Sequence, residues 1–261
     1  MSLLLWIILF SLLGGVLSVI AAGSFLLFPE RVRDRLLPHF VSFAIGALLG
    51  AAFLALLPHA ITSSPSVDVH DIGLTILAGI LIFFVLEKMV LWRHCHSSHC
   101  EAHTPEHGHD NKEHAAGIMV LIGDALHNLV DGVLIAAAFM TDIHLGIVTS
   151  LAVAAHEIPQ EVGDFAILLH SGFKRGKAFV FNILASTSTV IGALLAYFGL
   201  QGMESFIPFI LAIAASSFIY IAVADLIPGL HKRSHITATL QQIVLIISGV
   251  VVIYLAHSTL H

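Results

Sequence analysis

Residues 115–140 read AAGIMVLIGDALHNLVDGVLIAAAFM, and this stretch carries both features that decide the fold class. It is long enough to cross a bilayer, which requires about 20 mostly apolar residues. Its polar residues Asp124, His127, Asn128 and Asp131 are spaced at i, i+3, i+4 and i+7, which places all four on one helix face. The stretch therefore predicts a membrane-spanning helix with a polar stripe along one side.

The composition of the whole chain indicates the same class. Of its 261 residues, 57% are apolar and 11% are charged, against about 25% charged in a typical soluble domain. The mean hydropathy is +0.96. Eleven Lys and Arg against seventeen Asp and Glu leave no basic surface for nucleic acid. We expect an all-α integral membrane protein whose surroundings are the lipid bilayer, with no nucleic-acid partner.

Seven other stretches are comparably long and apolar, so we expect eight transmembrane helices. All eleven Lys and Arg lie in or beside the connections that follow spans one, three, five and seven. By the positive-inside rule, those connections face the cytoplasm and both termini face outside. The predicted spans are Leu3–Phe28, His39–Ile61, Asp71–Trp92, Ala115–Met140, His144–His170, Ala178–Leu200, Phe206–Leu230 and Thr239–His257.

These spans form a single transmembrane domain over residues 1–261. We expect it in the cytoplasmic membrane, with periplasmic or extracellular N- and C-termini. The first span lacks the basic start and short apolar core of a signal peptide, so it is interpreted as a retained helix. The long connection at 93–114 holds seven His and two Cys. It is interpreted either as a metal-catching segment or as a passive linker.

A second polar stripe lies on the fifth predicted span, where the polar residues again follow steps of three and four. Since spans four and five are antiparallel, the two stripes meet near mid-membrane. Imidazole, amide and carboxylate ligands together suit a divalent transition metal, and the acids suffice for two cations. Magnesium, which prefers oxygen-only shells, fits less well. The second stripe comprises His156, Glu157, Gln160, Glu161 and Asp164.

Prolines accompany ligand-type residues in three spans. Pro58 precedes His59, Pro159 lies inside the second stripe, and Pro228 follows Asp225. Proline removes a helix hydrogen bond and clashes with the carbonyl four residues back, so each position predicts a kink or a break. Broken helices at mid-membrane line the substrate sites of many transporters.

Other classes of protein remain as alternatives. His156-Glu157 begins like H-E-x-x-H, the zinc-protease helix, but Gln160 replaces the second His and Pro159 interrupts the helix. An intramembrane zinc-dependent hydrolase is therefore disfavoured, and we expect no enzyme. A buried polar network without metal would not need so many ionisable groups. A metal sensor would need an output domain. A metal exporter remains an alternative, because metal ligands alone do not indicate the direction of transport.

The segments HNLVDG at 127–132 and HEIPQEVGD at 156–164 resemble the metal-binding helices of the ZIP (Zrt-, Irt-like protein) family of zinc and iron importers. The resemblance implies an eight-helix bundle with a two-metal site between helices four and five. It also implies a homodimer that moves Zn²⁺ into the cytoplasm by an elevator-like shift, with Fe²⁺, Mn²⁺ or Cd²⁺ as other cargoes and no organic cofactor.

The family pattern also implies which residues bind metal. The first metal would take His127, Asp131, His156 and Gln160. The second would take Asn128, Glu157 and Asp225. His59 matches a span-two ligand of some members, and Asp124, Glu161 and Asp164 are further ligands or exit-path groups. Two departures bear on selectivity: Gln160 stands where His or Glu is common, and Ala51 and Ala55 stand where a related branch carries Asp and His.

Overall fold

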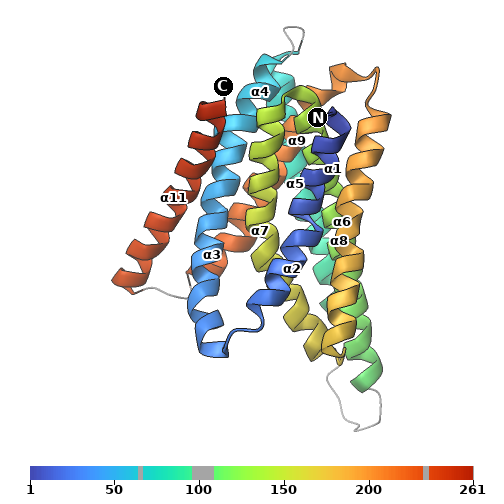
Figure 1. Cartoon of the computed structure of the whole chain (residues 1–261), viewed down its shortest axis with the longest axis vertical. Coiled ribbons are helices and arrows are strands. Elements are labelled where there is room, and N and C mark those ends of the chain that lie inside the picture. Colours follow the sequence, from blue (N-terminus) through green and yellow to red (C-terminus); the bar gives the residue numbers. More distant parts are fainter. Residues whose placement is uncertain (64–66, 96–108, 232–234, 261) are drawn as a thin grey trace.

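The structure, a computed structural model, describes residues 1–63, 67–95, 109–231 and 235–260. Within these ranges the chain is helical and contains no strand. The helices run side by side in one bundle, and the two ends of the chain lie at the same end of it (Figure 1). Most of the His-rich connection predicted at 93–114 lies outside the described residues, as do Lys232 and Arg233.

All eight predicted spans are helical. The first consists of two pieces, α1 (Leu3–Gly14) and α2 (Val16–Phe25), rather than the single helix expected. The break is at Gly15, where an added Cβ would lie 2.6 Å from the backbone oxygen of Ser186. This close approach to another helix requires glycine, and the chain turns slightly there.

Two spans contain π-helical segments. The second span runs through α3 (Glu30–Gly50), the π-helix η1 (Ala51–Leu56) and α4 (Leu57–Thr62). The seventh runs through a short 3-10 turn η2 (Glu204–Phe206), α9 (Ile207–Tyr220), the π-helix η3 (Ile221–Leu226) and α10 (Ile227–Leu230).

Each π-helix ends two residues before a proline, Pro58 or Pro228. Because proline has no N–H to donate, the preceding residues bond one position further back. The amide of Leu57 donates to the oxygen of Ala52, and the amide of Ile227 donates to that of Ala222. The predicted irregularities in these two spans therefore appear as π-helical turns.

The remaining helices are long and regular. They are α5 (Val69–Cys95), α6 (His109–Thr141), α7 (Ile143–His170), α8 (Arg175–Gly199) and α11 (Ile236–Leu260). Helix α7 continues through Pro159, so this proline does not divide it. Seven helices of the described chain are long and apolar enough to cross a membrane. Helix α7 is not among them, because its polar stripe lowers its mean hydropathy.

The helices pack in two groups. One contains α1, α2, α6, α7 and α8, and the other contains the α3–α4 span, α5, the α9–α10 span and α11. Helix α6 packs most extensively on α8, and α3 on α11. Glycines allow both contacts: a Cβ on Gly132 would lie 1.9 Å from the Thr189 oxygen, and one on Gly46 would lie 2.0 Å from the Ile246 oxygen.

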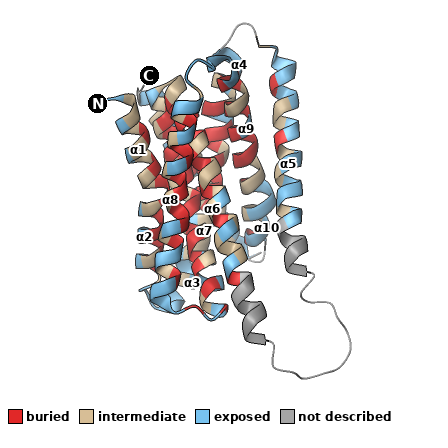
Figure 2. Ribbon diagram, turned by 90° about the vertical axis from the view of Figure 1, so that its right-hand side faces the viewer, coloured by how far each residue is buried: buried red, intermediate tan, exposed pale blue. Residues whose placement is uncertain are grey.

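The groups meet where α7 packs on α3 and α11, and where α6 packs on α9. Buried residues are concentrated along the centre of the bundle, whereas α5 at its edge is largely exposed (Figure 2). In their most apolar windows, α5 and α11 are each only 11% buried, against 61% for the α3–α4 span. The interior of the bundle is therefore built mainly by α3, α6, α7, α8 and α9.

Candidate metal centre

Helices α6 and α7 form a tight antiparallel hairpin. Only Asp142 separates them, and its carboxylate accepts the backbone amides of His144 and Leu145 at 2.8 and 3.1 Å, which caps α7. His127 and His156 lie at nearly equal distances from this connection, about 20 Å at ~1.5 Å per residue. The hairpin therefore places the two predicted polar stripes at the same depth.

Four side chains of the hairpin converge on one point. His127 Nε2 lies 3.4 Å from His156 Nε2, 3.3 Å from Glu157 Oε1 and 3.7 Å from Asp131 Oδ2. His156 Nε2 lies 3.3 Å from Asp131 Oδ2 and 3.6 Å from Glu157 Oε1. We call His127, Asp131, His156 and Glu157 the tetrad.

These separations match the edges of a tetrahedron around zinc. With Zn–N and Zn–O bonds of about 2.0–2.1 Å, the ligand atoms of a tetrahedral site lie about 3.3 Å apart. Two imidazoles and two carboxylates also suit zinc chemically, and their charges would neutralise a divalent ion. The side chain of His127 is 24% exposed while the other three are at most 1% exposed. The tetrad is thus open on the His127 side.

The second histidine is held by its surroundings. His156 Nδ1 lies 3.0 Å from the backbone oxygen of Ala152, a contact that favours a proton on Nδ1 and leaves the Nε2 lone pair for a metal. The ring of Phe218, from α9, packs against His156 with centroids 6.0 Å apart. The histidine is therefore oriented from both helix groups.

A second group of ligand atoms adjoins the tetrad and shares Glu157 with it. Asp124, Glu157 and Glu161 are all buried, and one carboxylate oxygen of each lies within 4.8 Å of the others. We call these three the acidic triad. Its ligands are oxygens alone, so it would suit a harder cation than the tetrad does.

Most oxygens of the two groups have no hydrogen-bond partner. This holds for Asp124 Oδ2 and for both carboxylate oxygens of Asp131, Glu157 and Glu161. Buried polar atoms in folded proteins are nearly always paired, because leaving them unpaired costs about 1–3 kcal/mol each. Such a concentration of unpaired acceptors indicates a place for cations.

Asn128 is engaged differently from the metal ligand expected. Its Nδ2 donates to Asp124 Oδ1 at 2.8 Å, and its Oδ1 accepts from Thr189 Oγ1 on α8 at 2.6 Å. The amide therefore links the acidic triad to α8. Thr189 was not anticipated from the sequence, since nothing in its own span singles it out.

The other predicted ligands lie around these two groups. Gln160 and Asp164 are half-buried on α7. Asp225 is exposed on η3, within electrostatic range of both histidines. His59, on α4, packs its ring against His257 of α11 with centroids 5.4 Å apart. The family pattern grouped Glu157 with Asn128 and Asp225, whereas the structure brings it to the two histidines.

One polar contact within the spans was missed. The Tyr220 hydroxyl donates to Glu87 on α5, and Asp225 lies within electrostatic range of both residues. Glu87 is an ionisable residue inside a predicted span, which alone marks it as a functional candidate. That signal was available in the sequence.

Fold and side-chain geometry together define a class: a helical membrane protein with a buried group of nitrogen and oxygen atoms that could hold a divalent metal. The family model described as ZIP Zinc transporter matches residues 2–115 and 92–257. The chain therefore belongs to the ZIP zinc transporter family.

The relatives of this chain are also named as zinc transporters. The chain is 34% identical over 239 residues to "Zinc transporter ZIP13" of Pongo abelii, covering 84% of this chain and 66% of that protein. It is 32% identical to the Mus musculus protein of the same name (84% and 69% covered). It is 29% identical to "Zinc transporter ZIP13 homolog" of Drosophila melanogaster (85% and 78%). The chain spans about two thirds of the length of the first of these relatives.

Proposed function

We propose that this protein carries zinc across the cytoplasmic membrane into the cytoplasm, with the tetrad as the site that holds the ion in transit. The observation that carries the proposal is the tetrahedral spacing of four zinc-type ligand atoms between α6 and α7. The names of its relatives support zinc as the cargo. Inward direction rests on the family resemblance.

The ligand set also argues against hydrolysis. Catalytic zinc sites keep three protein ligands and leave the fourth position to water. Here four side chains already surround the point where a metal would lie, so no position is left for a water nucleophile. The tetrad contains no thiolate, and imidazole and carboxylate ligands suit an ion that must be released again. A carrier fits these features better than an enzyme.

We propose eight crossings, with α7 as the crossing whose polar stripe holds the cargo. The two ends of the chain at one end of the bundle fit an even number of crossings (Figure 1). Helix α7 packs against helices of both groups and is long enough to span a bilayer. The charge distribution supports outer termini.

The two helix groups support an elevator-like mechanism. Glycine contacts hold α6 tightly on α8 and α3 tightly on α11, so each group can move as a unit. The ring contact of His156 on α7 with Phe218 on α9 supports a tetrad at the boundary between the two groups. Paired cysteines that lock α7 to α3 should abolish zinc entry, whereas pairs that lock α6 to α8 should spare it.

The family resemblance also supports a homodimer, for which α5 and α11 leave apolar surface available. Light scattering of the purified protein in detergent tests this proposal. A mass of one chain at all protein concentrations would contradict it.

The central experiment measures zinc entry into proteoliposomes that contain a trapped zinc dye. The wild type is compared with His127→Ala/His156→Ala and with His170→Ala, an exposed histidine on α7 outside the tetrad. We expect entry for the wild type and for His170→Ala, and none for the double variant. Equal entry by the double variant would overturn the proposed site, and binding without entry by the wild type would overturn transport.

A further inference from the structure

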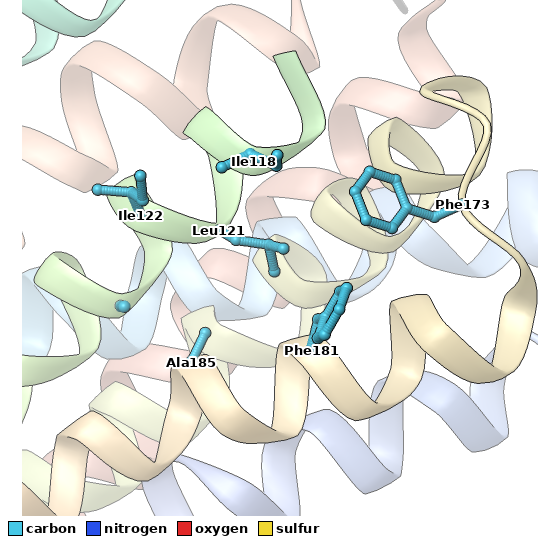
Figure 3. A pocket seen from close by; sticks show the side chains of 7 residues that line it. Ile118, Leu121, Ile122, Phe173, Phe181 and Ala185 are labelled. Atoms are coloured by element: carbon cyan, nitrogen blue, oxygen red, sulfur yellow. The ribbon is translucent and has the colours of Figure 1, made fainter. Parts of the chain in front are cut away.

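An apolar groove runs between α6 and α8, outside the metal centre (Figure 3). Its volume is ≈ 440 Å³, within the range of about 300–1,000 Å³ that is typical of small-molecule sites. Ile118 and Ile122 of α6 form one side, and Phe181 and Ala185 of α8 form the other. Phe173, from the turn before α8, closes one end and contacts Phe181 edge to face.

The groove fits within the depth of one lipid leaflet. Helix α8 begins at Arg175, and Ala185 lies about 15 Å along it at ~1.5 Å per residue. The hydrocarbon core of a bilayer is about 30 Å thick, so half of it is also about 15 Å. With Arg175 at the membrane surface, the groove lining at Phe181 and Ala185 would lie within the depth of one leaflet, alongside an acyl chain.

Positively charged residues lie at the end of this groove that is nearest the start of α8. Lys177, Phe181 and Ala185 are spaced at i, i+4 and i+8, so Lys177 occupies the face of α8 that lines the groove, one turn nearer its end. Lys174 directly follows Phe173. Both lysines are exposed, as is Arg175 between them. An apolar trough that ends in cations is complementary to a lipid with a negative headgroup.

We propose that this groove binds an anionic phospholipid, with an acyl chain along α6 and α8 and the headgroup phosphate at Lys174 and Lys177. Any lipid could cover an apolar trough, but the lysines select for negative charge near the membrane surface. The groove shares no residue with the tetrad or the acidic triad. The lipid would therefore bind to α6, which carries two of the tetrad ligands, and to α8. This proposal does not depend on which metal is carried or in which direction.

Native mass spectrometry tests the headgroup. Delipidated protein is mixed with equal amounts of phosphatidylglycerol or phosphatidylcholine, and the retained lipid is counted. We expect phosphatidylglycerol to be retained preferentially, and Lys174→Gln/Lys177→Gln to lower its affinity about tenfold or more. Arg31→Gln/Arg35→Gln is the control: it removes two exposed positive charges from the start of α3, away from the groove. It should retain the lipid.

A second pair of variants tests the apolar walls. Phe181→Ala should weaken phosphatidylglycerol binding several-fold. Phe198→Ala removes a more exposed phenylalanine of α8 (62% against 37%) that lies outside the groove, and it should not. Equal retention of both lipids, or equal loss in test and control variants, would overturn the proposal. So would displacement of the lipid by inorganic phosphate alone, or a dimer mass that is lost with Phe181→Ala, which would assign the groove to a second copy of the chain.

Discussion

Helix α6 has two faces that are built in opposite ways. Toward α8 it is close-packed and satisfied: Gly132 lies against the Thr189 backbone, and Asn128 accepts the Thr189 hydroxyl. Toward α7 it presents charged groups, and both carboxylate oxygens of Asp131 lack hydrogen-bond partners. The first face holds the helix in place, and the second leaves unpaired ligand atoms for a cation. The close-packed contact with α8 thus positions the unpaired carboxylate oxygens that face α7.

The largest effect should come from the unsatisfied face. Asp131→Asn keeps the size of the side chain but removes the charge that both histidines face. Losing an outer-shell partner of a metal site already costs about 10–100-fold in affinity, so losing a ligand charge should cost more. Zinc titration of the purified protein measures this. Asp71→Asn, an exposed position on α5, is the matched control. Unchanged affinity in Asp131→Asn would remove the tetrad from consideration.

Acidity should weaken the same face without any mutation. Histidine and carboxylate ligands must lose protons before they bind metal, so protons compete with zinc. Apparent zinc affinity should fall as the pH falls from 8 to 5, by about tenfold per pH unit for each proton that zinc displaces. Zinc entry at fixed zinc concentration, with equal pH on both sides, checks the sign. A flat profile over this range would contradict metal binding by the tetrad.

The close-packed face should respond to volume instead of charge. Gly132→Ala would place a Cβ 1.9 Å from the Thr189 oxygen, and overpacking of this kind costs about 1–3 kcal/mol. Thermal unfolding should therefore begin at a lower temperature, with or without zinc. Gly123→Ala, on the same helix with nothing within 4 Å of the new Cβ, should keep the melting temperature or raise it slightly, since alanine favours the helix over glycine. Equal melting of the two variants would mean that α8 does not hold α6 through this contact.

An effect of comparable size and opposite sign is expected in the acidic triad. Glu161→Gln removes one of three buried carboxylates and gives the site a hydrogen-bond donor. The metal-free protein should gain about 1–3 kcal/mol of stability, since fewer buried acceptors stay unpaired. Stabilisation by added zinc or by a second cation should decrease. Differential scanning fluorimetry with and without metal separates these effects. Lower stability in the metal-free state would show that the triad is satisfied as it stands.

The smallest effect should come from the link between the two faces. Thr189→Val removes the hydroxyl that Asn128 accepts while keeping the shape, at a cost of about 1 kcal/mol. Asn128 would then orient Asp124 less firmly, and cation binding at the triad should weaken several-fold. Thr187→Val, at an exposed hydroxyl that bonds only within its helix, is the control. Equal cation binding in both variants would make the link purely structural.

The sequence predicted the stripes and their meeting, because both follow from helical spacing and from the short connection at Asp142. The family resemblance implied Asp131 beside both histidines, but it grouped Glu157 with Asn128 and Asp225, whereas Glu157 Oε1 lies 3.3 Å from His127 Nε2. The position of each acid depends on how the helices are rotated, and contacts such as that of Thr189 with Asn128, 61 residues away, help to fix the rotation of α6. Similarly, the break at Gly15 depends on Ser186 of α8. Local patterns determine the helices, whereas contacts between distant segments determine their rotation.

The prolines show the same division. Their positions in the sequence indicated irregular helices at residues 58, 159 and 228. The structure has π-helices before Pro58 and Pro228, whereas α7 is continuous through Pro159. Proline removes the same hydrogen bond in each case. What differs is the packing around each proline, and this packing cannot be derived from the local sequence pattern.

The one-residue connection at Asp142 limits the ways in which the metal centre could release a bound ion. Two steps of the chain join Thr141 to Ile143 and reach at most about 7 Å, which the distance of about 8–10 Å between packed helix axes already takes up. Helices α6 and α7 therefore cannot slide past each other by a full helical turn of about 5.4 Å while both stay helical. Two of the four tetrad ligands come from each helix, and the hairpin therefore keeps them in register through any larger motion. Release would then have to come from outside the hairpin, by water reaching the His127 side and replacing ligands one at a time.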